Sequence, residues 1–174
     1  MSMKKIILIL LLLLGLGAII LYINDSSFNP LKKRDFQKLF DKYNGTAEKI
    51  CDVDFLGANF KSEWFEVYLY KVGVIPINSN YPDYNGIWEQ KEITDEAVTS
   101  KWTSCPLNST TRELYEFTLT VENFDKKECV KSFNAELNNP ENYYSHVYFN
   151  ELEQYFLLYC PSLGNLYYLR RKGF

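Results

Sequence analysis

The chain opens on a long apolar segment. Residues 6–23 form a run of 18 residues without a charged side chain, and Lys4 and Lys5 precede them. A helix of that length spans about 27 Å, close to the thickness of the hydrocarbon core of a bilayer. No good signal-peptidase site accompanies the run. The pattern predicts an uncleaved transmembrane signal anchor over 6–23, preceded by a basic tail at 1–5.

The next segments indicate a linker and the start of a folded domain. Residues 24–29 are mainly polar and are interpreted as a linker. Apolar residues then recur with the spacing i, i+3, i+4, i+7 of an amphipathic helix, at Phe36, Leu39, Phe40 and Tyr43. We therefore expect a helix over 30–43 and a single domain over 30–174.

From residue 49 onward the period changes from that of a helix to the period of two that is typical of strands. The clearest alternation of apolar and polar residues lies at 114–124. Segment 151–158 is also compatible with a helix, because a short apolar run does not determine its own period. The expected strands are 49–55, 60–74, 87–93, 114–124, 143–149, 154–160 and 166–171.

Two further helices are expected, over 94–102 and 125–137, because each follows capping residues. Segment 78–86 consists almost entirely of turn formers and is interpreted as a surface loop. Together these elements predict an α+β domain. Its antiparallel sheet has about five to seven strands, with two or three helices packed on one side.

Composition narrows the class of protein. The chain has 174 residues, of which 47% are hydrophobic and 17% aromatic, so it is long enough for one packed domain and too short for a multidomain enzyme. Its formal net charge is −3. Because binding to phosphates requires clustered Lys and Arg, nucleic acid is excluded as the main partner.

The cysteines suggest an oxidising compartment. Cys51, Cys105, Cys129 and Cys160 are an even number of widely spaced thiols, which favours two disulfides over a zinc site. Three connectivities are possible, and we prefer Cys105 with Cys129 and Cys51 with Cys160. The alternative is four free, buried cysteines in a cytoplasmic domain.

Signals for membrane orientation conflict. Five basic residues at 32–42 favour a cytoplasmic domain by the positive-inside rule. The lysines at the N-terminus and the even number of cysteines favour export. We expect a single-pass protein of the inner (cytoplasmic) membrane whose C-terminal domain is periplasmic or otherwise extracytoplasmic.

No catalytic motif is present, so no catalytic residue, metal site or cofactor is assigned. His146, the only histidine, lies in a tyrosine-rich strand and is interpreted as structural. The pairs Asp52-x-Asp54 and Glu151-x-Glu153 have the spacing of acid–base or cation-binding carboxylates, but such spacings often arise by chance.

Tyrosine and tryptophan near polar turns are typical of recognition surfaces. We therefore expect Tyr81, Tyr84 and Trp88 to be binding residues in or beside the loop at 78–86. The predicted function is a membrane-anchored recognition or accessory protein, such as an inhibitor, an immunity-type protein or an envelope-binding module, with a protein or glycan partner. The alternative is a small envelope hydrolase using Asp52 and Asp54. Three or more polar side chains converging in a cleft would distinguish an enzyme.

Overall fold

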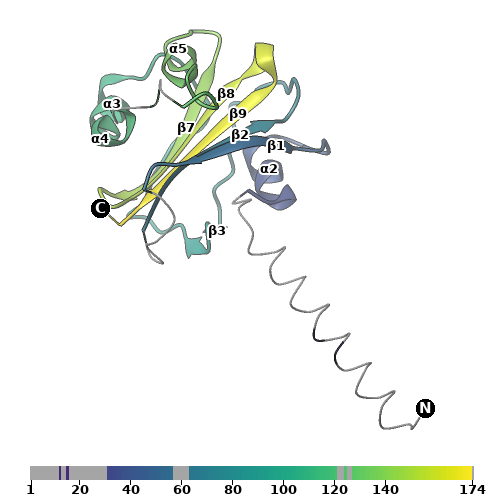
Figure 1. Ribbon diagram of the computed structural model, residues 1–174, viewed down its shortest axis with the longest axis horizontal. Coiled ribbons are helices and arrows are strands. Elements are labelled where there is room, and N and C mark those ends of the chain that lie inside the picture. Colours follow the sequence, from purple (N-terminus) through teal and green to yellow (C-terminus); the bar gives the residue numbers. More distant parts are fainter. Residues whose placement is uncertain are drawn as a thin grey trace, which may run out of the picture. The chain divides into compact units, whose positions relative to one another are not determined.

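The structure is a computed structural model that describes residues 31–56, 63–120, 124 and 127–173, together with Leu12 and Gly15. The chain divides into two units, Met1–Pro30 and Leu31–Phe174. The elements described below all belong to the second unit (Figure 1).

Within the described residues, seven strands form one antiparallel sheet with the order β1-β2-β9-β8-β7-β5, and β6 also pairs with β7. Two further strands, β3 and β4, form a separate hairpin. The strand bounds are β1 Glu48–Asp54, β2 Trp64–Lys71, β3 Ile87–Trp88, β4 Lys91–Glu92, β5 Val98–Thr99, β6 Thr103–Ser104, β7 Tyr143–Asn150, β8 Glu153–Cys160 and β9 Asn165–Lys172.

Successive residues of the long strands point to opposite faces of the sheet, and both faces are covered. On β8, Tyr155, Leu157 and Tyr159 face one hydrophobic core, which we call the α2-side core. Phe156 and Leu158 face the other, which we call the α5-side core. All eight residues of β8 are buried as a result.

Short helices cover the two faces, as Figure 1 shows. Helix α2 (Lys33–Leu39) packs Phe36 and Leu39 into the α2-side core. On the opposite face, α5 (Phe133–Leu137) packs Phe133 and Leu137 into the α5-side core. The other helices described in this unit are α3 (Ser109–Leu114), α4 (Glu116–Leu119) and the 3₁₀ turn η1 (Pro161–Leu163).

The predicted fold class is wrong about the placement of helices. They do not lie on one side of the sheet, because α2 and α5 contribute to cores on opposite faces. The physical reason is the pattern of β2, β8 and β9, whose apolar residues occupy both faces and require cover on each.

The predicted transmembrane anchor is not supported, because no helix within the described residues is long and apolar enough to cross a membrane. Helix α2 has only seven residues, whereas a span needs about 20. Of residues 6–23, all but Leu12 and Gly15 lie outside the described part of the chain. The predicted localisation was a single-pass inner-membrane protein with a periplasmic domain. It required this anchor and is therefore not supported either.

Three local predictions are also wrong. Of the strand expected at 114–124, residues 114–120 are not a strand, because α3 and α4 lie there and bury Thr111, Tyr115 and Thr118 at helical spacing. Residues 121–123 lie outside the described part of the chain. Segment 94–102 is not a helix, since β5 pairs with β7 there. Segment 87–93 is a tight hairpin and not one strand. By contrast, β7, β8 and β9 lie where three strands were expected.

The cysteines form one disulfide, between Cys51 and Cys129. The preferred pairs, Cys105 with Cys129 and Cys51 with Cys160, are therefore wrong. Cys51 lies on β1 and Cys129 lies in the segment before α5. The bond therefore joins the edge strand of the sheet to the segment that leads into α5. Cys105 and Cys160 are free and buried, and burial raises the pKa of both thiols.

The denatured, unreduced protein should therefore expose two reactive thiols, which thiol titration in denaturant measures. Replacing Cys51 and Cys129 together with serine should lower the free energy of unfolding by roughly 2–4 kcal/mol, because the cross-link closes a long loop. Zero or four thiols in the unreduced protein would contradict this pairing.

Candidate functional site

The expected recognition loop buries two of the three aromatic residues assigned to it. Tyr84 is 5% exposed and Trp88 is 1% exposed, while Tyr81 is half-buried. The Tyr84 hydroxyl lies 2.8 Å from the Ser145 hydroxyl on β7, and the Trp88 ring packs edge-on against Tyr84 and Tyr168. These contacts make Tyr84 and Trp88 core residues and not an exposed binding surface.

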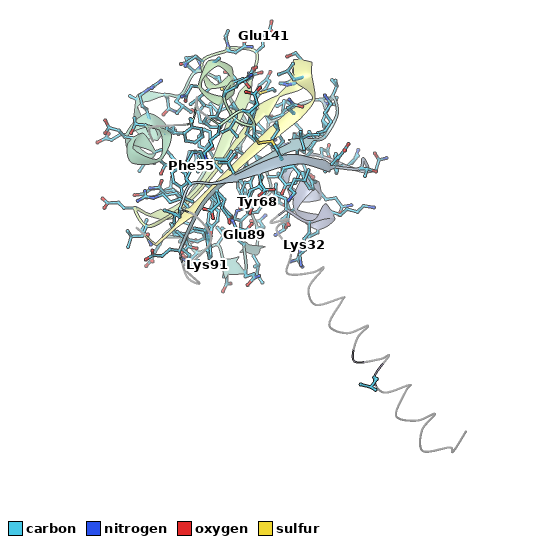
Figure 2. The ribbon with its side chains drawn as sticks, viewed as in Figure 1. Lys32, Phe55, Tyr68, Glu89, Lys91 and Glu141 are labelled. Carbon is cyan, nitrogen blue, oxygen red and sulfur yellow. A yellow bond between two sulfur atoms is a disulfide. The ribbon has the colours of Figure 1, made fainter. Side chains whose placement is uncertain are left out.

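The hairpin β3–β4 explains why these residues are buried. Glu89 and Gln90 at its tip both have positive φ, at 48° and 66°, which turns the chain tightly enough to fold it back onto the sheet. Arg170 then bonds the Glu89 carboxylate at 3.2 Å, and Lys91 bonds Glu153 at 2.8 Å. In Figure 2, Tyr68, Glu89 and Lys91 lie on the same side of the sheet.

Polar side chains complete this attachment. The Arg170 guanidinium donates to Glu66 at 2.6 Å, and the Tyr168 hydroxyl donates to Glu89 at 2.9 Å. Burial raises the pKa of Glu89, while Arg170 opposes the rise. Because Arg170 pairs with both carboxylates, we interpret this network as structural.

The carboxylate pairs noted in the sequence do not form acid–base pairs. Asp52 and Asp54 are exposed on edge strand β1; Asp52 pairs with Lys49 at 2.8 Å and Asp54 accepts a backbone N–H. Glu153 is buried on the α2 side against Lys91 and Tyr155, whereas Glu151 is exposed in the turn before β8.

His146 is a buried residue of β7, only 4% exposed. Its Nδ1 lies 3.1 Å from the Ser100 hydroxyl, and its ring lies 5.4 Å from that of Tyr115. Burial lowers the pKa of His146 to about 4, so the imidazole is neutral at physiological pH. The surroundings fit the structural interpretation.

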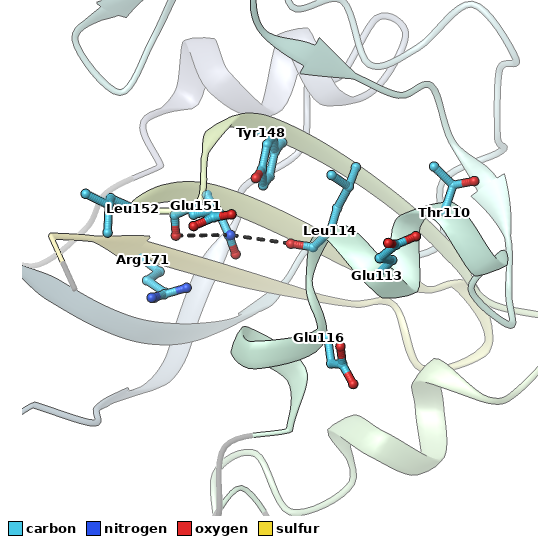
Figure 3. Close-up of a pocket in the computed structure, with 9 residues that line it drawn as sticks. Thr110, Glu113, Leu114, Glu116, Tyr148, Glu151, Leu152 and Arg171 are labelled. Atoms are coloured by element: carbon cyan, nitrogen blue, oxygen red, sulfur yellow. Dashed lines mark hydrogen bonds between the residues drawn. The ribbon is translucent and has the colours of Figure 1, made fainter.

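The candidate site is a hollow of about 760 Å³ between the α3–α4 segment and the ends of β7, β8 and β9 (Figure 3). Its size lies within the range of ligand-binding pockets. It combines carboxylates with apolar walls, of which Leu152 is 55% exposed. The lining residues are Thr110, Glu113, Leu114, Glu116, Tyr148, Glu151, Leu152, Gln154 and Arg171.

A chain of hydrogen bonds holds the floor of this hollow. The Arg171 guanidinium donates to the Thr118 hydroxyl at 3.3 Å, and Thr118 donates to the Gln154 side-chain oxygen at 2.5 Å. The Gln154 amide then reaches the carbonyls of Leu114 and Glu151, as the dashed lines of Figure 3 show. Side chains from β8, β9 and α4 are thereby fixed relative to the turn before β8.

The electrostatics of the hollow are acidic. Three glutamates and one arginine line it, which gives the lining a net charge of −2. Burial lowers the pKa of Arg171, and the nearby Glu151 carboxylate opposes that change. The charge of Glu151 thus favours the charged form of Arg171. Glu113 and Glu116, by contrast, form no ion pair with any cation in the described part of the chain.

The sequence did not predict the hollow. The alternation at 114–124 predicted a strand, which would place Glu116 on the face toward solvent. One available signal was Asn108, whose side chain accepts the Thr111 N–H and caps α3. The second was the helical spacing of Thr111, Tyr115 and Thr118.

Comparisons of the chain with protein-family models, with curated proteins and with solved structures found no match.

Replacement of Trp88 by alanine should lower the free energy of unfolding by about 3–5 kcal/mol, because it removes a large, fully buried ring. The matched change Tyr81→Ala should cost clearly less, since Tyr81 is half-buried. Urea unfolding followed by circular dichroism measures both. Equal, small losses would show that Trp88 is not a core residue.

His146 should make stability depend on pH. Its pKa of about 4 in the folded protein lies below that of an unfolded histidine, near 6.5, so its contribution is complete above pH 6.5 and is lost as pH falls toward 4. His146→Gln should reduce the loss of unfolding free energy between neutral pH and about pH 4.5 by roughly 2 kcal/mol. Urea unfolding of both proteins at the two pH values tests this. Identical pH profiles would contradict it.

Proposed function

We propose that this protein is a non-enzymatic recognition module that binds a basic side chain of a partner protein in the hollow between the α3–α4 segment and the sheet. One observation carries this proposal. Glu113 and Glu116 present carboxylates to a hollow of about 760 Å³ and form no ion pair among the described residues.

The walls of the hollow favour lysine or arginine over a bare cation. Leu114, Tyr148 and Leu152 supply apolar surface against which the methylene stem of a long basic side chain packs. The carboxylates then neutralise its charged head. A basic protein segment fits this combination better than the glycan that was the other expected partner, because Tyr148 is the one aromatic ring among the described side chains of the lining that could stack on a sugar.

The fixed floor suits recognition. The bonds among Arg171, Thr118 and Gln154 hold the base of the hollow in one arrangement before any partner arrives. A preformed site loses less conformational entropy on binding, so more of the contact energy contributes to affinity. The exposed Leu152 extends the apolar wall outward, where a partner surface would cover it.

A small hydrolase is the second candidate, because several polar side chains do converge in this hollow. Its carboxylates would be Glu113, Glu116 and Glu151, and not the predicted Asp52 and Asp54, which lie on β1. No histidine, serine or cysteine lines the hollow as described. The three glutamates are exposed to water, whereas an enzyme's reacting groups usually lie in a site from which water is expelled.

The probe for the recognition function is a blocked pentapeptide of alternating lysine and leucine, with a glutamate–leucine peptide of equal length as its counterpart. The lysine peptide should bind, and binding should weaken at about 0.5 M salt because of screening. The double variant Glu113→Gln/Glu116→Gln should reduce affinity about fivefold, the combined effect of two exposed ion pairs. Isothermal titration calorimetry measures each affinity.

Glu141→Gln is the matched control, because Glu141 is exposed and does not line the hollow. It should bind the lysine peptide like the unmodified protein. Equal affinity for the two peptides, or an unchanged affinity in the double variant, would overturn the recognition proposal. Hydrolysis of nitrophenyl glycosides or esters that Glu113→Gln abolishes would favour the enzyme instead.

A further inference from the structure

The tripeptide Tyr-Asn-Gly occurs twice in the chain, at 43–45 and at 84–86. An asparagine that precedes glycine loses its side-chain amide readily, because glycine has no side chain to hinder attack by its own backbone nitrogen. The residue before each asparagine is also the same. In the unfolded chain the two asparagines should therefore react at the same rate, and any difference in the folded protein comes from the structure.

The reaction needs only water. The backbone nitrogen of the glycine attacks the side-chain carbonyl carbon of the asparagine, and a five-membered succinimide ring forms. The amide nitrogen leaves as ammonia and takes the proton that the glycine nitrogen loses. Water then opens the ring at either of its two carbonyls and produces aspartate or isoaspartate. The net change replaces an amide by a carboxylate and adds one negative charge.

For this attack, the peptide unit between asparagine and glycine has to rotate toward the asparagine side chain. Hydrogen bonds that hold this unit oppose the rotation, because they must break before the nitrogen reaches the carbonyl carbon. The bonds around the two peptide units therefore decide which asparagine reacts in the folded protein.

Asn44 and Gly45 lie in the irregular segment between α2 and β1, and both are exposed. Neither residue forms a hydrogen bond, through its backbone or its side chain, with any group in the described part of the chain. Gly45 lies against the Tyr43 ring, since a Cβ atom at position 45 would be 3.1 Å from it. That neighbour makes van der Waals contact and places no hydrogen bond on the peptide unit.

Asn85 and Gly86 are also exposed, but hydrogen bonds hold them. The Asn85 N–H donates to the Asp83 carboxylate at 3.1 Å, and the Asn85 carbonyl accepts from the Lys38 ammonium at 3.2 Å. The Gly86 carbonyl accepts the Ile93 N–H at 2.9 Å. The Lys38 bond matters most, because its acceptor belongs to the peptide unit that has to rotate.

We propose that Asn44 is a site of spontaneous deamidation and that Lys38 protects Asn85, the asparagine of the second identical tripeptide, from the same reaction. The new carboxylate lies on the exposed segment that leads into β1. In the isoaspartate product, the backbone of this segment is also longer by one methylene group. Neither asparagine lines the hollow at α3–α4, so the modification is independent of the proposed function.

The test incubates the full chain at mildly alkaline pH. Peptide mass spectrometry follows the mass increase at each asparagine, and an isoaspartyl methyltransferase labels the isoaspartate product. In the folded protein, Asn44 should react about fivefold faster than Asn85 or more, because about one net hydrogen bond must first break at Asn85. In guanidinium chloride, with the disulfide reduced, the two rates should be equal.

Two variants test the cause of the difference. Lys38→Met keeps the apolar stem and removes the ammonium, so it should raise the rate at Asn85 about fivefold and leave that at Asn44 unchanged. Lys127→Met is the matched control, because Lys127 is exposed and donates to neither asparagine; it should change neither rate. Asn44→Gln should remove the faster reaction, since glutamine would have to close a larger ring.

Equal rates at the two asparagines of the folded protein, or a faster reaction at Asn85, would overturn the proposal. So would an Asn44 that stays intact while the denatured chain reacts. An unchanged rate at Asn85 in folded Lys38→Met would contradict the protection assigned to Lys38. Urea unfolding verifies that this variant is folded, and if it is not, the comparison of the two asparagines in the unmodified protein decides.

Discussion

The burial of β8 on both faces is the constraint on which the rest of this structure depends. Its odd-numbered residues, such as Tyr155 and Leu157, belong to the α2-side core, and its even-numbered residues, such as Phe156 and Leu158, belong to the α5-side core. A strand of this kind is stable only if both faces of the sheet are covered. Short helices and the β3–β4 hairpin provide that cover, which explains why elements that look marginal in isolation are ordered here.

The alternation of side chains between the two faces also determines where the two arginines near the end of β9 point. Arg170 and Arg171 are neighbours on β9, so their side chains leave opposite faces of the sheet. Arg170 attaches the hairpin through Glu66 and Glu89, while Arg171 bonds Thr118 in the floor of the acidic hollow. One pair of consecutive arginines thus supports a structural network on one face and the candidate binding site on the other.

The sequence predicted the three long C-terminal strands, because their apolar residues are dense and turns separate them. It could not predict the hairpin, since Glu89 and Gln90, which adopt positive φ at its tip, are not typical turn formers. Segment 114–124 alternates like a strand, yet its residues up to 119 belong mainly to the helices α3 and α4. The disulfide partners and the residues that line the hollow at α3–α4 lie far apart in the chain, and local patterns carry no information about which of them meet. The expected signal anchor came from residues 6–23, almost all outside the described residues, and no described helix supports it.

Amide hydrogen exchange followed by NMR tests the central role of β8 most directly. Amides that open only on global unfolding exchange slowest. If both cores depend on β8, its amides and those of β9 should be the slowest in the protein, while those of edge strand β1 and of β5 exchange faster through local opening. Exchange from β8 as fast as from β1 and β5 would contradict this account.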